Sequence, residues 1–191
     1  IYSFDERNLT GCVNFYDVEL DKIEFSSNGS KCEDAVNFVR SSGLVKKLSI
    51  LNSAFDAMDS DFSKLTFENI EVNNSKNDCM DFSYGTYRVN RSFLENCGDK
   101  AISVGEKSNI SIENTIIKNS NYAIVSKDYS TAKIADSVIS NTKVCFQAFN
   151  KKQEFSGGLL KIKNVTCDES NYKKTEFDNK SEIKFVEWAL D

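Results

Sequence analysis

A repeat of 22 residues is the feature that most constrains how this chain can fold. The segment from Phe55 to Asp61 and the segment from Asn77 to Ser83 carry the same pattern one period apart. Stepping by this period in both directions gives an apolar column, and its regularity indicates that each period builds the same structural unit. The members of the column are Val36, Met58, Met80, Ile102, Ile124 and Phe146.

A second column, two residues further on, is apolar or small, and the residues between the two columns are mostly polar. Alternation with a period of two is typical of a strand with one buried face. Each period then adds a second short strand pattern, usually followed by Asn or Asp, which tolerate the left-handed backbone of tight turns. The second column is Phe38, Ser60, Phe82, Val104, Ser126 and Ala148, the intervening outward positions are Asn37, Asp59, Asp81, Ser103, Val125 and Gln147, and the turn residues are Asn69, Asn114, Asp136 and Asn164.

A repeat of about 20 to 25 residues with two or three short strands predicts a solenoid, in which stacked coils supply the core that one coil cannot bury alone. No stretch shows the sustained 3.6-residue period of a helix. The pattern resembles that of the right-handed parallel β-helix, so we predict an all-β solenoid with coils of about 22 residues. Residues 1–191 are expected to form one domain, with an N-terminal coil or cap over 1–30, regular coils over 31–167 and a C-terminal cap over 168–191.

Composition narrows the classes of function. A net charge of −5 and a pI near 5.0 argue against a general nucleic-acid binder, which would carry a basic face. Histidine is absent, which removes Ser-His-Asp and Cys-His nucleophile systems and histidine-ligated zinc. There is no apolar run long enough for a membrane helix and no signal-peptide pattern, so we expect no membrane insertion. Because the chain begins at Ile1 rather than Met, we expect a processed protein or a fragment of a longer one with further domains.

The six cysteines suggest pairs whose members lie about one coil apart, with separations of 20, 18 and 22 residues. Disulfides between neighbouring coils would place the protein outside the cytosol, secreted, in the periplasm or at the cell surface. A ladder of buried free thiols is the alternative, since spacing alone does not fix connectivity. The suggested pairs are Cys12 with Cys32, Cys79 with Cys97, and Cys145 with Cys167.

Acidic residues gather on the outward side of the first strand. Adjacent coils lie about 4.8 Å apart, so we expect Asp56 over Asp78 and Asp59 over Asp81. Two carboxylates at that distance repel by roughly 3 kcal/mol at an effective dielectric of 20. Three compensations are open: a bound cation, an acid/base pair with one raised pKa, or neutralisation by Lys100 and Lys127. The full acidic face comprises Asp34, Asn37, Asp56, Asp59, Asp61, Asp78 and Asp81.

Calcium is the cation that this face fits best, because it takes about 6 to 8 oxygen ligands and tolerates irregular geometry. We predict Asp56, Asp59, Asp78 and Asp81 as its ligands. A lysine beside such a site loses its proton more readily and can act as a base.

The acidic coils resemble two groups of pectin-active β-helix enzymes. In polygalacturonases, the matching series is Asn-Thr-Asp, Asp-Asp-Cys, Gly-His-Gly and Arg-x-Lys, which implies Asp56 and Asp78 as water-activating carboxylates and Lys127 as a substrate-binding residue. Asn77, Lys100 and Val125 depart from that series at the general acid, the histidine and the arginine. The segments that carry the resemblance are Phe55-Asp56-Ala57-Met58-Asp59, Asn77-Asp78-Cys79, Ile102-Ser103-Val104-Gly105 and Lys127.

The second resemblance is to calcium-dependent pectate lyases. Asn77-Asp78-Cys79-Met80-Asp81, with Asp56 one coil earlier, is similar to an Asp-Asp-x-x-Asp calcium cluster. The resemblance implies β-elimination, in which a cation acidifies the carbon beside a uronate carboxylate and Lys100 or Lys127 removes its proton. The coil from Gly98 to Ser108 also resembles uncharacterised bacterial repeat proteins of this fold.

Two functions follow as expectations. The first is an enzyme that acts on an acidic polysaccharide. A calcium-dependent lyase or epimerase fits the residues better than a glycoside hydrolase does. Its candidate catalytic residues are Lys100, Lys127 and Asp78. The second is a non-catalytic glycan-binding or structural domain of a larger surface protein. An enzyme needs a free lysine beside the metal, whereas a structural site would leave both lysines in salt bridges.

Overall fold

The computed structural model describes residues 9–168 and 173–187, and within them it shows strands and turns but no helix. The described part of the chain thus has no helix that could cross a membrane. The strands are β1 Gly11–Tyr16, β2 Glu19–Asn28, β3 Asp34–Val39, β4 Ser42–Ser53, β5 Asp56–Asp61, β6 Lys64–Ser75, β7 Met80–Ser83, β8 Thr86–Cys97, β9 Lys100–Gly105, β10 Asn109–Lys127, β11 Thr131–Phe149, β12 Leu159–Cys167, β13 Lys173–Phe177 and β14 Glu182–Phe185.

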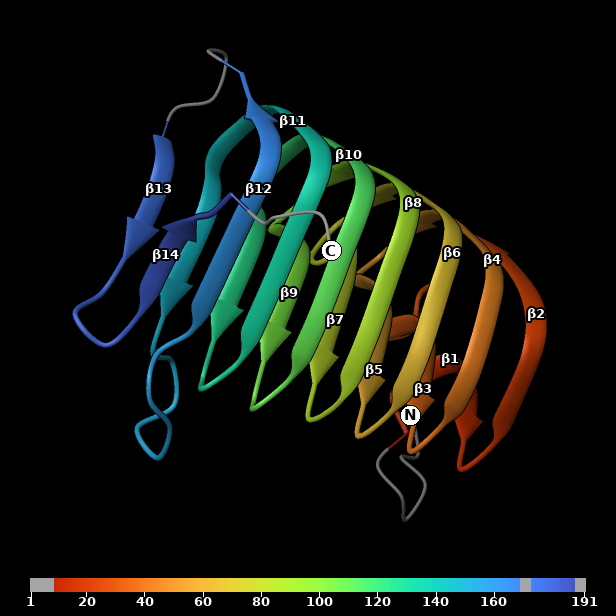
Figure 1. Ribbon diagram of the computed structural model, residues 1–191. Helices are drawn as coiled ribbons and strands as arrows, with labels where there is room; N and C mark the ends of the chain where they lie inside the picture. The colour runs from red at the N-terminus through yellow and green to blue at the C-terminus, as the bar shows by residue number, and fades with distance from the viewer. Residues whose placement is uncertain (1–8, 169–172, 188–191) are drawn as a thin grey trace.

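The strands stack into a parallel β-solenoid (Figure 1). One column of strands runs β1, β3, β5, β7 and β9 and continues through the second parts of β10 and β11 to β13. The other runs β2, β4, β6 and β8 and continues through the first parts of β10 and β11 to β12 and β14. All of these pairings are parallel, which confirms the predicted all-β solenoid.

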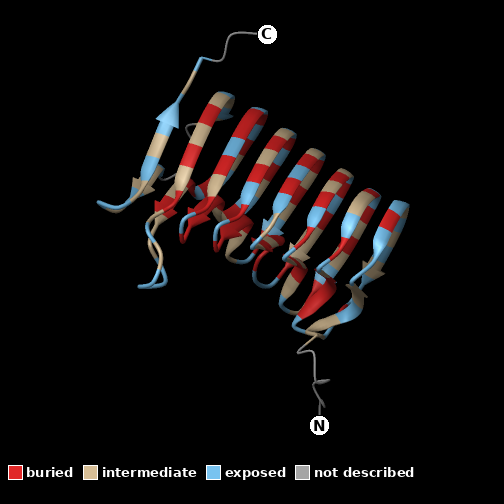
Figure 2. Ribbon diagram, turned by 60° about the horizontal axis from the view of Figure 1, so that its bottom comes forward, coloured by how far each residue is buried: buried red, intermediate tan, exposed pale blue. Residues whose placement is uncertain are grey.

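The register of the first column confirms the 22-residue step. Val36 pairs with Met58, Met58 with Met80, and Met80 with Ile102, and the series continues to Phe146. These side chains are fully buried, and inward and outward positions alternate along the strands (Figure 2). Aromatic rings fill the first coils, where the Phe67 ring packs edge-on against Phe38 and Phe82. Stacking therefore supplies the core that a single coil lacks.

The turns follow the prediction from Asn and Asp. Asn69, Asn114, Asp136 and Asn164 all have positive φ, between 47° and 53°. Arg91, which occupies the same place in its coil, has φ 54° without the side-chain chemistry that favours it. The structure also contains the three suggested disulfides, so the free-thiol alternative is wrong. Their Cα atoms are 5.3 Å apart for Cys12–Cys32, 5.5 Å for Cys79–Cys97 and 6.3 Å for Cys145–Cys167.

The C-terminal part adds strands to the stack. β13 pairs with β11 and β14 pairs with β12, so the described residues beyond Cys167 continue both columns. The predicted C-terminal cap over 168–191 includes Trp188, which lies outside the described residues. The insertion between β11 and β12 folds back over the turns that follow β7 and β9: Lys152 Nζ lies 2.5 Å from Glu106 Oε1, and the Phe155 ring contacts Tyr84.

An acidic groove on the first strand column

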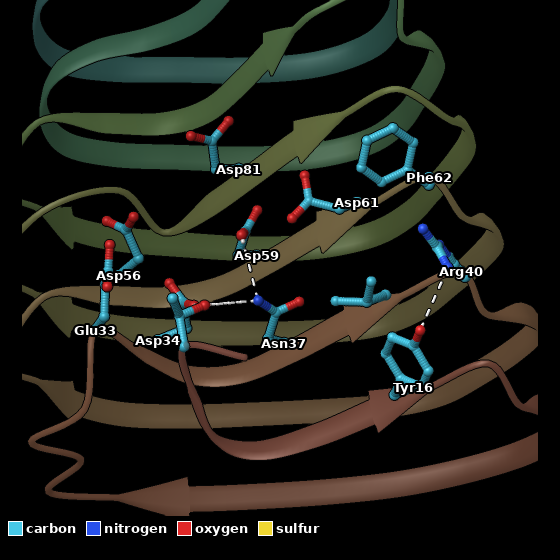
Figure 3. Close-up of a pocket in the computed structure, with 12 residues that line it drawn as sticks. Tyr16, Glu33, Asp34, Asn37, Arg40, Asp56, Asp59, Asp61, Phe62 and Asp81 are labelled. Carbon is cyan, nitrogen blue, oxygen red and sulfur yellow. Dashed lines mark hydrogen bonds between the residues drawn. The ribbon is translucent and has the colours of Figure 1, made fainter. Parts of the chain in front are cut away.

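The outward side of β1, β3, β5 and β7 carries a groove of about 610 Å³ (Figure 3). Six carboxyl groups line it, and Arg40 is the one cationic side chain among the described lining residues. Beyond β7 the outward column is covered, since Ser103 and Val125 are completely buried. The lining residues are Thr10, Tyr16, Glu33, Asp34, Asn37, Val39, Arg40, Asp56, Asp59, Asp61, Phe62 and Asp81.

One column of carboxyl groups bonds to the backbone of the next coil. Asp56 Oδ1 accepts hydrogen bonds from the Asp78 backbone N–H at 2.7 Å and from Asn77 Nδ2 at 2.6 Å. One coil on, Asp78 Oδ1 accepts the Lys100 backbone N–H at 3.0 Å. Asp34, one coil before Asp56, accepts a hydrogen bond from the Thr10 hydroxyl. These contacts join the segments that lead into successive strands. They also occupy oxygens of Asp56 and Asp78, which were predicted to bind metal.

A second row of polar side chains, Asn37, Asp59 and Asp81, also lines the groove. Asn37 pairs in register with Asp59, and Asp59 with Asp81, as the repeat predicts. Asp81 Oδ1 accepts the Phe82 backbone N–H at 2.9 Å, and its Oδ2 lies 3.9 Å from Lys127 Nζ. Asp61 lies two residues beyond Asp59 on the same side of β5, so it projects into the same groove.

Burial raises the pKa of five side chains on the acidic face, Asp34, Asp56, Asp59, Asp61 and Asp78. It brings the pKa of Asp34, Asp56 and Asp61 to about 6, and neighbouring carboxyl groups add to the rise. The pKa of Asp78 rises to about 7 because burial and then Asp81 outweigh the attraction of Lys100. Burial, followed by repulsion from Asp61 and Asp81, lifts the pKa of Asp59 well above its usual value. The groove therefore opposes the full ionisation of its own side chains.

Both lysines expected as bases are engaged. Lys100 Nζ bonds to Asp99 and lies 3.4 Å from Asp78 Oδ1; burial alone would lower its pKa, but the two carboxylates raise it. Lys127 is 5% exposed, and its Nζ donates to Ser103 Oγ at 2.9 Å. A base must reach the proton that it removes, and here both amines are turned toward protein partners.

An aromatic and cationic rim, which the sequence reasoning missed, borders the groove. Arg40, Phe62 and Tyr84 follow β3, β5 and β7 and share a left-handed backbone, with φ of 51°, 52° and 50°. The Phe62 and Tyr84 rings stack at 4.7 Å, and Arg40 Nη1 donates to the Tyr16 hydroxyl at 3.3 Å. The spacing of these three residues by 22 is the signal that could have found them.

Comparison with known proteins adds no assignment: no family model, curated protein or solved structure matches the chain. Among the described residues, no three or more Cys, Asp or Glu side chains form a group that could hold a metal ion. The predicted set lies on two adjacent rows of this face, Asp56 with Asp78 and Asp59 with Asp81.

Proposed function

We propose that this β-solenoid binds an acidic polysaccharide in the groove over β1, β3, β5 and β7, with calcium bridging the polymer to the acidic floor. The observation that carries the proposal is the juxtaposition of Arg40 and the exposed Phe62 ring with a carboxyl-lined floor. On this proposal the chain is a glycan-binding module, either in its own right or within a larger surface protein.

The rim fits a uronic acid unit. Phe62 is 54% exposed, so its ring offers apolar surface to the C–H groups of a pyranose. Arg40 is exposed one coil away and can hold a carboxylate with two parallel N–H donors. A uronate that packs on Phe62 would thus direct its charge toward Arg40.

Charge on the groove floor explains the need for a cation. Six lining carboxyl groups face one arginine, and an acidic polymer on such a floor would meet like charges. A calcium ion accepts oxygen ligands from protein and polymer together, and so converts repulsion into attraction.

Binding comes ahead of elimination chemistry in this proposal because Lys100 and Lys127 are both engaged by protein partners. The three disulfides support a secreted, periplasmic or cell-surface location, because such bonds persist in oxidising compartments.

The proposal predicts that Arg40→Ala weakens polyuronate binding about tenfold, equivalent to about 1.4 kcal/mol. Arg91→Ala is the matched control: Arg91 is also exposed and has φ 54°, but it pairs with Glu68 on another face. Isothermal calorimetry with pectate and alginate, in calcium and in chelator, gives the affinities. Equal losses in the two variants would place the polymer elsewhere.

The same samples also distinguish binding from catalysis. Absorbance near 235 nm rises when β-elimination creates an unsaturated uronate. We expect binding without this rise. A rise that Lys127→Ala abolishes would instead establish a lyase with Lys127 as its base.

A further inference from the structure

The side-chain oxygen of Asn37 lacks a partner in the most acidic part of the groove. Asn37 is 2% exposed, and no hydrogen-bond donor among the described residues reaches its Oδ1. A buried acceptor without a donor destabilises the folded chain, because it has lost its hydrogen bonds to water and gained none in return. Such an atom among carboxyl groups indicates a ligand that accepts electron pairs, namely a cation.

The surrounding hydrogen bonds fix the orientation of the Asn37 amide. Its Nδ2 lies 2.8 Å from Thr10 Oγ1, 3.4 Å from Asp34 Oδ2 and 3.5 Å from Asp59 Oδ2. The Thr10 hydroxyl donates its own proton to Asp34, so all three atoms act as acceptors toward Asn37. Turning the amide over would set an oxygen against three oxygens. The amide oxygen must therefore point away from them, toward the side of the groove where Asp61 lies (Figure 3).

Asp59 and Asp61 complete the set of oxygens. Asp59 lies in register with Asn37, one coil on, and Asp61 follows two residues later on the same side of β5, where both line the groove. Neither residue has a basic side chain bonded to its carboxyl group among the described contacts, in contrast to Asp78 with Lys100. Two carboxyl groups and one amide oxygen are hard oxygen ligands of the kind that calcium takes, and water from the open groove can supply the rest.

We infer that the groove holds one divalent cation, coordinated by Asn37 Oδ1 and the carboxylates of Asp59 and Asp61. The inference deepens the proposed function, on which it rests, by placing its cation at Asn37 and Asp61 instead of at Asp56 and Asp78. Asp56 and Asp78 then act as structural groups that bind the backbone of the following coil.

Calcium titration of the metal-stripped chain by isothermal calorimetry, without polysaccharide, tests the site. We expect one calcium ion per chain, and an affinity at least tenfold weaker in Asp61→Asn and in Asn37→Leu. Asn37→Asp keeps an oxygen at the ligand position and should retain binding, which a purely structural role for Asn37 would not predict. Glu71→Gln, an exposed acid on β6 outside the groove, serves as the control and should change the affinity less than twofold.

Circular dichroism of each variant shows whether it folds. If Asn37→Leu does not fold, Asn37→Asp and Asp61→Asn still test the site. Absence of calcium binding to the wild-type chain would overturn the inference. So would binding that Asp78→Asn abolishes while Asp61→Asn leaves it intact. Calcium binding without polyuronate binding would support the site and contradict the proposed function. Polyuronate binding in chelator, with no calcium signal, would contradict both the cation site and the calcium bridge, and would leave only the polymer-binding part of the proposed function.

Discussion

Phe82→Ala should lower the free energy of unfolding by about 3 to 5 kcal/mol, the usual cost of emptying a large aromatic position in a core. Phe82 is completely buried, and its ring lies 5.8 Å from that of Phe67 and 4.7 Å from that of Tyr87. It stacks between Ser60 and Val104, and neither is large enough to fill the space. For a chain of this length, the melting temperature should fall by about 10 °C.

Urea denaturation followed by circular dichroism measures this loss. Phe177→Ala is the matched control, because Phe177 is 59% exposed on β13 and its removal should cost less than about 0.5 kcal/mol. In a solenoid each coil contacts only its neighbours, so a defect at Phe82 should also lower the m-value if the two ends begin to unfold separately. Similar losses in the two variants would show that the column through Phe82 does not carry the core.

The repeat alone predicts the fold because every coil buries the same inward positions against its two neighbours. Once Val36, Met58 and Met80 are aligned at a step of 22, the inward faces and the strand register follow from coil spacing. The same spacing suggests the three cysteine pairs, but it does not exclude free thiols, and only the structure decides between them. Side-chain periodicity of two then decides which residues face out. The acidic face was predictable for the same reason, and the observed pairing of Asp59 with Asp81 confirms its geometry.

The division of the acidic face into two roles was not predictable from spacing. Asp56 and Asp59 lie on the same strand and both line the groove, yet only Asp56 accepts the backbone N–H of Asp78 in the next coil, whereas Asp59 stacks in register between Asn37 and Asp81. That difference depends on side-chain rotamers and on the local path of the chain into β7. Likewise, the reach of Lys127 to Ser103 depends on a long side chain that sequence spacing does not place.

Tertiary context also overrides local preference at two places. Residues 173–177 fall within the predicted C-terminal cap, but pairing with the edge of β11 makes them strand β13. Phe62 and Tyr84 adopt a left-handed backbone that bulky side chains rarely accept. The coil geometry imposes that turn, and stacking of the two rings compensates part of its cost.

The chain should be more stable near pH 5 than near pH 8. Asp34 and Asp56 have pKa values of about 6 and Asp78 of about 7, all above the unfolded value of 3.8. The folded state therefore binds more protons than the unfolded state between about pH 4 and pH 7, and the free energy of unfolding falls as pH rises through that range. A carboxyl group whose pKa is two units higher in the folded state than in the unfolded state would, if it titrated alone, lower the free energy of unfolding by roughly 3 kcal/mol between pH 4 and pH 8.

The raised pKa values arise partly from repulsion between the same carboxyl groups, so their separate contributions cannot simply be added. We therefore expect the free energy of unfolding to differ by several kcal/mol between pH 5 and pH 8. Glu106 acts in the opposite sense at the acidic end. Its ion pair with Lys152 holds its pKa below the usual 4.5 although burial opposes this, so its stabilisation is lost as pH falls below about 4.5. The two trends together place the maximum near pH 5.

Urea unfolding between pH 4 and pH 8 measures this profile, and Asp56→Asn provides its internal test. The substitution keeps an oxygen that can accept the Asp78 N–H but removes one titrating group, so the decline toward pH 8 should become shallower. Calcium at pH 8 should restore stability to the wild-type chain, because a bound cation offsets the same repulsion that protons offset at pH 5. A profile that rises from pH 5 to pH 8 without calcium would mean that the carboxyl groups are ionised at little cost, and the groove would then need no cation to be stable.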